Sequence, residues 1–246
     1  MGWYRDTNWT PHGFLRSPDG GVTTIDVPVA GALLTQALGI NARGDIVGTY
    51  GDSGGVRHGF LLRRNGSFRS LDPPNSQDTV ARGINSKGDI VGFFNFFSAG
   101  FLLSREGDFA QIDVPFDGVL DTLAFSINNQ GEIVGPFDDG SGSHGFLRSQ
   151  DGVYTQIDVP FPGGHDTNAF GNNDNGKIVG CWIDSAGMTH AFVRGKNGNF
   201  VSFDFPASSQ TIAFGTNQKG DIVGQYDDAD SKTHGFLRTN KAPFGD

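Results

Sequence analysis

A segment of about a dozen residues recurs five times in this chain of 246 residues, and its period constrains the fold more than any other feature. The copies follow a pattern close to G-I-N-x-x-G-D-I-V-G, and their starts lie 44, 43, 45 and 44 residues apart. Self-similarity at such a period is typical of repeat folds, in which each unit buries its apolar face against its neighbours. The copies begin at Gly39, Gly83, Ser126, Gly171 and Gly215.

Two further motifs recur with the same period. One is H-G-F-L, with the variants H-A-F-V and A-G-F-L; it begins at His12, His58, Ala99, His144, His190 and His234. The other is close to T-x-I-D-V-P, and its aspartates are Asp26, Asp72, Asp113, Asp158 and Asp204. One unit therefore accounts for nearly the whole chain.

Each unit is expected to form four short strands. The segments T-x-A-x-G-I-N, D-I-V-G-x-Y, H-G-F-L-R and T-x-I-D-V-P are separated by turns, and pairs such as Asp19-Gly20 and Asn65-Gly66 suit tight hairpins. No window shows the 3.6-residue apolar period of a helical solenoid. The sequence predicts an all-β fold, a five-bladed β-propeller of four-stranded antiparallel blades.

We expect one propeller domain over residues 1–246. Its units run over 35–78, 79–121, 122–166, 167–210, and 211–238 completed by 12–34. The last unit lacks an outermost strand, and Thr23–Pro28 is expected to supply it and close the ring. Either His12 or His234 then begins a redundant copy of the H-G-F-L strand.

The motifs H-[GA]-F-[LV] and G-I-N-x-x-G-D-I-V-G resemble those of the HAF family of probable extracellular repeats, from about Gly2 to Arg238. The resemblance implies a propeller that is exported and works outside the cell. It implies no particular activity and no catalytic residue. The first residues, MGWYRDTNWT, do not have the pattern of a signal peptide.

Composition excludes several classes of function. A net charge of −9 argues against nucleic acid as the partner, because phosphate binding needs a concentrated basic surface. No apolar stretch is long enough for a membrane-spanning helix. Cys181 is the only cysteine, so the chain has no internal disulfide. We also expect a monomer that does not insert into a membrane.

Strand alternation places the loops on two faces of the predicted ring. The loops after I-D-V-P and after I-V-G-x-Y share one face, which we call the top face, and they contain eleven aspartates against Arg57 and Lys232. We expect this acidic face to favour cations or polyhydroxy ligands. The alternative is that the aspartates form turns and keep the protein soluble.

Three aspartates precede the innermost strand of three blades, in the pairs Asp78-Thr79, Asp121-Thr122 and Asp166-Thr167. Convergent carboxylates could hold Ca²⁺ through oxygen ligands. A pair of them could instead flank a glycosidic bond as acid and base. A third interpretation is structural, with Asp and Thr capping the start of each strand. No cofactor is otherwise expected.

The repeated histidines are interpreted as structural. Each begins the strand antiparallel to the I-D-V-P strand, so we expect cross-strand pairs of His58 with Asp72, His144 with Asp158, and His190 with Asp204. Asp113 is expected to have no such partner, because Ala99 stands at the histidine position of that unit.

Departures from the repeat are the better candidates for a single binding site. His165 is the only histidine outside the H-G-F position, Trp182 replaces the usual tyrosine, and Phe97 belongs to an aromatic run. Arg82 occupies a position held elsewhere by Leu or Phe. Aromatic side chains could stack on sugar rings, or Phe97 could simply fill the gap left by a shorter loop.

These observations favour a secreted, non-catalytic binding or scaffold module that recognises carbohydrate or a surface polymer. Its candidate binding residues are Asp78, Asp121, Asp166, His165, Trp182, Phe97 and Arg82. The alternative is a glycan-active hydrolase or lyase that uses Asp78, Asp121, Asp166 and His165. A third possibility is a purely structural repeat.

Overall fold

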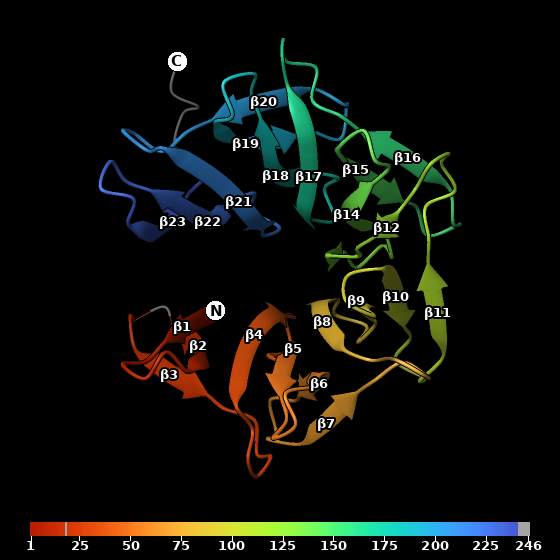
Figure 1. Ribbon diagram of the computed structural model, residues 1–246, viewed down its shortest axis with the longest axis vertical. Coiled ribbons are helices and arrows are strands. Elements are labelled where there is room, and N and C mark those ends of the chain that lie inside the picture. The colour runs from red at the N-terminus through yellow and green to blue at the C-terminus, as the bar shows by residue number, and fades with distance from the viewer. Residues whose placement is uncertain (18, 241–246) are drawn as a thin grey trace. The chain divides into compact units, whose positions relative to one another are not determined.

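The computed structural model describes residues 1–17 and 19–240, and these residues form strands, turns and bends but no helix (Figure 1). Accordingly, none of them forms a helix long and apolar enough to cross a membrane. The chain divides into two compact units, Met1–Asp113 and Val114–Asp246, which are described separately as unit 1 and unit 2.

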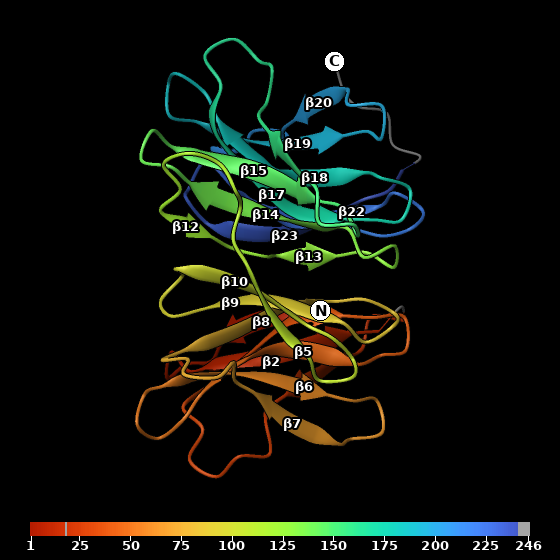
Figure 2. The same ribbon diagram turned by 90° about the vertical axis from the view of Figure 1, so that its right-hand side faces the viewer.

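Unit 1 contains three antiparallel sheets, each built from strands consecutive in sequence. Figure 2 shows three neighbouring strands of one of them, β8 (Thr79–Ile84), β9 (Ile90–Phe94) and β10 (Ala99–Leu103), side by side. The sheets are β1(Gly2–Arg5), β2(Pro11–Arg16) and β3(Val22–Ile25); β4(Leu34–Ile40), β5(Ile46–Gly51), β6(Arg57–Leu62) and β7(Phe68–Leu71); and β8(Thr79–Ile84), β9(Ile90–Phe94), β10(Ala99–Leu103) and β11(Phe109–Ile112).

Unit 2 repeats the same order of antiparallel strands, with one parallel bridge between Thr189 and Gln210. The first strand of its first sheet is split in two. Between the halves, the backbone amides of Leu123 and Phe125 still donate hydrogen bonds to the neighbouring strand, at the carbonyls of Pro136 and Val134. The strands are β12(Asp121–Thr122), β13(Ser126–Ile127), β14(Ile133–Asp138), β15(Ser143–Arg148) and β16(Tyr154–Ile157); β17(His165–Asn172), β18(Ile178–Ile183), β19(Thr189–Arg194) and β20(Phe200–Phe203); and β21(Gln210–Thr216), β22(Ile222–Asp227) and β23(Thr233–Arg238).

The all-β class and the four-stranded unit expected from the repeat are therefore confirmed. Four of the described sheets contain all four segments, from the T-x-A-x-G-I-N strand, which we call the inner strand, to the I-D-V-P strand. The sheet β1–β3 has no inner strand, and the group β21–β23 has no fourth strand. The count of five complete blades in a closed ring stays a prediction.

The expected closure of the ring by Thr23–Pro28 stays a prediction. The strand β3 pairs with β2 of its own sheet, in the register Gly13 to Ile25 and Arg16 to Val22. A tight hairpin joins them, in which the Ser17 amide donates to the Gly21 carbonyl at 2.8 Å. Closing a hairpin of this length costs little chain entropy, which favours the local pairing of β2 and β3.

Close approach between the first two strands of each sheet explains the glycine of I-V-G. A Cβ at Gly48 would lie 1.9 Å from the Gln36 carbonyl oxygen, and one at Gly180 would lie 1.9 Å from the Asn168 carbonyl oxygen. Just beyond this contact the inner strand has a β-bulge, for example between Ala37 and Gly39. The glycine therefore allows the bulged inner strand to approach its neighbour.

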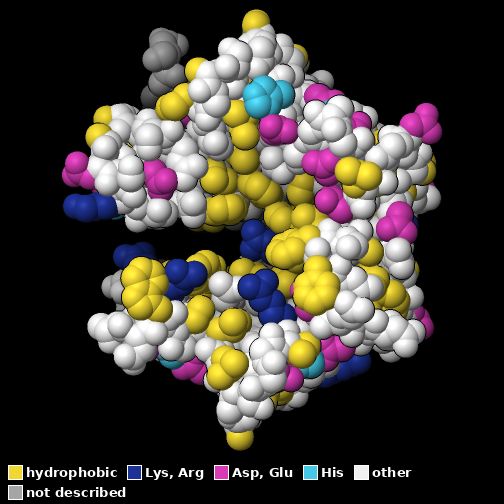
Figure 3. Space-filling view, in the orientation of Figure 1, with side chains coloured by type: hydrophobic (Ala, Val, Ile, Leu, Met, Phe, Trp, Pro, Cys, Tyr) yellow, Lys and Arg dark blue, Asp and Glu magenta, His cyan; other side chains and the backbone are white. Residues whose placement is uncertain are grey.

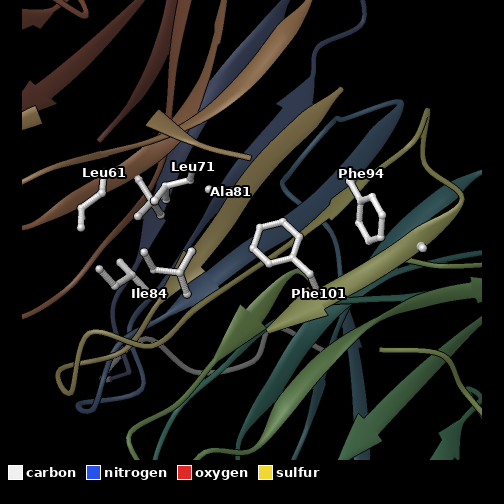
Figure 4. Close-up of a cluster of buried hydrophobic side chains, with 9 residues drawn as sticks. Leu61, Leu71, Ala81, Ile84, Phe94 and Phe101 are labelled. Atoms are coloured by element: carbon white, nitrogen blue, oxygen red, sulfur yellow. The ribbon is translucent and has the colours of Figure 1, made fainter. Parts of the chain in front are cut away.

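Sheets stack by burying aliphatic residues of one repeat against the inner strand of the next. In unit 1, Val47 and Leu61 belong to a buried cluster with Ala81, Ile84 and Phe101, part of which Figure 4 shows. In unit 2, Val179 and Val193 pack with Ala213 and Ile222 in the same way. The core therefore lies between successive sheets of each unit, as expected for stacked repeats.

The asparagine of G-I-N links one repeat to the next. The Oδ1 of Asn41 accepts hydrogen bonds from the backbone amides of Arg43 and Asp45, both at 3.0 Å. Its Nδ2 donates to Asp45 Oδ2 and to the Asn85 carbonyl oxygen of the following repeat, both at 3.1 Å. Asn173 likewise donates to the Asn217 carbonyl oxygen at 2.8 Å. The sequence shows this asparagine in every unit, but not that it joins two sheets.

Candidate functional site

Four histidines of the H-G-F-L motif each lie between two carboxylates, namely His12, His58, His144 and His190, and His234 contacts Asp228. His58 Nδ1 lies 3.1 Å from Asp72 Oδ2, and its Nε2 lies 3.3 Å from Asp52 Oδ2. The expected cross-strand pairs are confirmed for His58, His144 and His190. The second carboxylate was not predicted. It comes from the loop before the histidine, where an aspartate recurs at Asp6, Asp52, Asp139, Asp184 and Asp228.

Burial lowers the pKa of His58, but its hydrogen bonds to Asp72 and Asp52 outweigh that effect, so the pKa is raised overall. Asp52 also accepts hydrogen bonds from the amides of Gly54 at 2.8 Å and Val56 at 2.9 Å. The Val56 bond is the largest cause that lowers the pKa of Asp52, followed by the bond from His58. These groups hold the loop and the strand in place, and this favours their structural interpretation.

An aromatic ring stacks on each of these imidazoles, and Trp182 is one of these rings. Its ring lies 4.7 Å from that of His190, and its Nε1 donates to Ser202 Oγ at 3.0 Å. Only 7% of Trp182 is exposed. Tyr50 occupies the same place on His58, at 5.2 Å. Trp182 therefore packs inside its sheet, and the structure gives it no surface for a ligand.

Asp78 in unit 1 is buried, and its Oδ1 accepts a hydrogen bond from the backbone amide of Phe96. The Asp78 carbonyl also accepts from the Asn95 amide at 3.2 Å. Its carboxylate is thus committed to fixing the loop between β9 and β10.

Asp121 and Asp166 in unit 2 also cap backbone groups. Asp121 accepts from the Asp138 amide at 3.2 Å, and Asp166 accepts from the Ser143 amide at 2.9 Å. Burial is the main cause that raises the pKa of Asp121, whereas the Ser143 bond is the main cause that lowers the pKa of Asp166. Across residues 1–17 and 19–240 no group of three or more His, Cys, Asp or Glu could hold a metal ion.

His165 lies at the start of β17 with about half of its side chain exposed. Its Nδ1 is 2.7 Å from Asp166 Oδ2. Asp166 has a positive φ of 49°, an uncommon backbone conformation for a residue other than glycine. The contact joins two consecutive residues at the start of β17.

Arg82 occupies the bulge of β8, between Ala81 and Gly83. It is partly buried, and burial lowers its pKa to about 10. The corresponding residues of unit 2 form a row of rings, because Phe170 lies 5.4 Å from Phe125 and 5.6 Å from Phe214.

The loop after β9 presents two phenylalanines to solvent. Asn95, Phe96 and Phe97 have φ values of 54°, 55° and 70°, three successive residues in the left-handed region. Phe96 is 67% exposed and Phe97 45% exposed, although the Phe97 ring stacks on buried Phe93 at 4.8 Å. Left-handed backbone costs of order 1–3 kcal/mol per residue and persists where surrounding contacts enforce it. Here the contacts with Asp78 enforce it.

A cavity of about 200 Å³ lies in unit 1 between β7 and the hairpin of β10 and β11. Arg69 and Asp72 contribute polar groups to its wall, and Phe101 and Phe109 contribute rings 5.9 Å apart. Two successive prolines complete one side, at positions 73 and 74. None of the binding residues predicted from the sequence lines this cavity. Its only sign was Asp-Pro-Pro where other units have Asp-Val-Pro or Asp-Phe-Pro.

The acidic loops do not form one patch on the face shown in the space-filling view, where Asp and Glu side chains are spread over several loops (Figure 3). Several of these aspartates have the structural role of Asp52. Asp184 accepts from the amides of Ala186 and Met188, and Asp228 from those of Asp230 and Lys232, at 2.8 to 3.0 Å. They cap tight turns, so net charge alone does not locate a ligand site.

Comparisons with known proteins bear on the fold. No family model matches the chain, and no curated protein matches it. Among solved structures, the chain is similar to virginiamycin B lyase from Staphylococcus aureus, with a TM-score of 0.56 and 15% identity over 95% of this chain and 87% of that one.

Two other structures show a comparable likeness. TolB from Acinetobacter baumannii has a TM-score of 0.60 and 12% identity over 97% of this chain and 63% of that one. A gluconolactonase from Xanthomonas campestris has a TM-score of 0.51 and 13% identity over 84% and 77%. These β-propeller proteins have different roles, and the identities are low, so the likeness extends to the fold alone. The chain has an all-β fold of the propeller type.

Proposed function

We propose that this chain is a non-catalytic binding module for carbohydrate or a surface polymer, with its ligand in the cavity between β7 and β10–β11. The observation that supports this best is the composition of the cavity wall. Arg69 and Asp72 offer a hydrogen-bond donor and an acceptor, and the rings of Phe101 and Phe109 lie beside them. Ligand sites commonly combine apolar walls with a few polar groups in this way. Sugars present both hydroxyls and apolar faces, so they suit such a wall.

The engagement of the candidate catalytic groups supports binding over hydrolysis. Asp78, Asp121 and Asp166 each accept a hydrogen bond from a backbone amide. A carboxylate that works as acid or base must instead reach the proton that it transfers. The proposed site is therefore the cavity and not the acidic loops.

The setting that we propose is extracellular, and the protein is proposed to act as a monomer. The support for export is the resemblance of the repeat to the HAF family. Fractionation of the source cells and sedimentation of the purified chain test these two points.

A glycan array followed by calorimetry tests the proposed function. We expect saturable binding of at least one glycan and at least tenfold weaker binding by Arg69→Ala, with Arg57→Ala as the control because Arg57 is exposed outside the cavity. Phe109→Ala is matched by Phe200→Ala, which removes a ring from the corresponding position of β20. Only Phe109→Ala should weaken binding.

The array is repeated with a chelator. Unchanged binding is expected, and loss of binding would show that a cation such as Ca²⁺ takes part. Failure to bind any glycan would contradict the proposal and favour a purely structural repeat.

A further inference from the structure

We propose that the binding site continues from the cavity of unit 1 onto the ring of Phe96, so that its ligand is a glycan chain and not a single sugar. This inference rests on the proposed function and names the class of glycan. Phe96 lies in the loop between β9 and β10 and is 67% exposed. It is not part of the cavity wall, so a ligand that contacts both must extend beyond the cavity.

Two elements of the cavity wall lead to the Phe96 loop. On one side, β10 contributes residues to the wall, and the chain enters β10 directly from this loop. On the other side, Pro73 and Pro74 line the cavity and begin the connection from β7 to β8. The end of that connection contacts the same loop, because the Gln77 amide donates to Asn95 Oδ1 at 2.9 Å. Both sides of the cavity therefore lead to one place, beside Phe96.

Hydrogen bonds to the backbone hold the Phe96 loop in place. Oδ1 of Asp78 accepts from the Phe96 amide, and the Asp78 carbonyl accepts from the Asn95 amide at 3.2 Å. Ser98 Oγ donates to the Asn95 carbonyl at 2.7 Å. Asp78 is 5% exposed, so these bonds anchor the loop to the interior of unit 1. A loop that is already ordered loses little conformational entropy when a ligand binds to it.

The backbone of this loop is strained where comparable loops are relaxed. The corresponding loops after β5 and β18 have positive φ at glycines, Gly55 at 84° and Gly187 at 81°, where such values carry no steric cost. Phe96 and Phe97 have φ values of 55° and 70° instead. The Phe96 side chain returns little stability for this strain, because it is mostly exposed. Backbone strain of this kind clusters at sites that bind ligands.

An exposed phenyl ring suits the apolar face of a sugar. Aromatic side chains bind through large, flat apolar surfaces, and sugar rings present an apolar face besides their hydroxyls. Phe97 extends the apolar surface, since it is 45% exposed and stacks on buried Phe93 at 4.8 Å. The cavity holds one part of the chain beside Arg69 and Asp72, and Phe96 holds a later sugar. Because both sugars belong to one molecule, the second contact raises the affinity of the whole chain.

Chain length is the first test. Hexasaccharides and disaccharides of the cello, chito, malto and laminari series are titrated into the full chain by calorimetry. We expect at least one hexasaccharide to bind at least tenfold more tightly than the disaccharide of its series. Equal affinity for the two lengths in every series, or no binding by any hexasaccharide, overturns the inference. The glycan array decides the proposed function separately, since a short sugar held in the cavity alone would satisfy that function.

Variants of Phe96 are the second test. Phe96→Ala should weaken hexasaccharide binding at least tenfold and leave disaccharide binding unchanged, whereas Phe96→Tyr keeps a ring and should keep the affinity. The matched control is Trp9→Ala, because Trp9 is an exposed aromatic residue in another loop and has a φ of 64°. Circular dichroism checks that each variant is folded. Hexasaccharide binding that Phe96→Ala leaves unchanged, or that Trp9→Ala weakens equally, overturns the inference.

Discussion

Replacing Asn173 by alanine tests whether the G-I-N asparagine holds successive repeats together. Its side chain is buried and makes three hydrogen bonds. Oδ1 accepts from the amides of Asn175 at 3.0 Å and Lys177 at 3.1 Å, and Nδ2 donates to the Asn217 carbonyl at 2.8 Å. At about 1 kcal/mol of net stability per bond, the variant should lose about 3 kcal/mol of the free energy of unfolding.

The assay is urea unfolding followed by circular dichroism and tryptophan fluorescence. Asn197→Ala is the control, because Asn197 is in an exposed hairpin turn and accepts one bond from the Asn199 amide at 3.2 Å. We expect this control to lose less than 1 kcal/mol. An equal loss in the two variants would refute the reasoning.

Asn173→Asp separates the two roles of the side chain. An aspartate keeps an acceptor for the two turn amides but cannot donate to the Asn217 carbonyl, and it directs a carboxylate at that oxygen. A loss at least as large as that of Asn173→Ala would place the stabilisation in the link between repeats. Near-native stability would place it in the turn.

Three further predictions concern the glycines, the histidines and the strained loop. Gly180→Ala should prevent native folding or cost more than about 3 kcal/mol, because its Cβ would lie 1.9 Å from the Asn168 carbonyl oxygen; a native circular dichroism spectrum and melting temperature would contradict this. The raised pKa of His58 contributes stability that is fully present below the unfolded value near 6.5 and is lost as pH rises through the folded pKa. His58→Gln should therefore flatten that part of the stability profile measured by urea unfolding from pH 5 to 8, and an unchanged slope would count against it. Phe96→Gly should stabilise unit 1 by about 1 kcal/mol by relieving a φ of 55°, as read from thermal melts, because the Phe96 side chain is mostly exposed; a loss of stability would refute the strain argument.

The repeat allowed the strands and their pairing to be predicted, because the same pattern of strands and turns occurs in several copies. Pairing within a sheet depends on neighbouring segments, so the histidine and aspartate of adjacent strands could be matched from spacing alone. His58 and Asp72, 14 residues apart, meet as expected. Closure of the ring by Thr23–Pro28 stays a prediction, because the first and last repeats carry the same H-G-F-L motif and the repeat does not show which copy completes the last unit.

The candidate site was harder to predict because a departure from the repeat does not show whether a side chain faces solvent. Trp182 is rare in sequence but occupies the same interior place as Tyr50. The cavity beside Arg69 and Phe109 depends on how two sheets diverge, which no motif encodes. The second carboxylate recurs two residues after the aromatic residue of I-V-G-x-Y, as in Asp52 and Asp184, but the repeat alone does not show that it reaches the imidazole.

The asparagine link also bears on how such a chain can change length in evolution. Asn41 and Asn173 each bind the backbone of the asparagine that lies 44 residues later, so the bond does not depend on the identity of that side chain. Duplication or loss of one whole unit by unequal recombination would join equivalent surfaces and recreate the same bond at the new junction. Units of slightly different length keep the bond, because Asn128 donates to the carbonyl of Asn173, 45 residues later. The fold thus favours gain and loss of whole repeats, and it leaves the loops between them free to diverge.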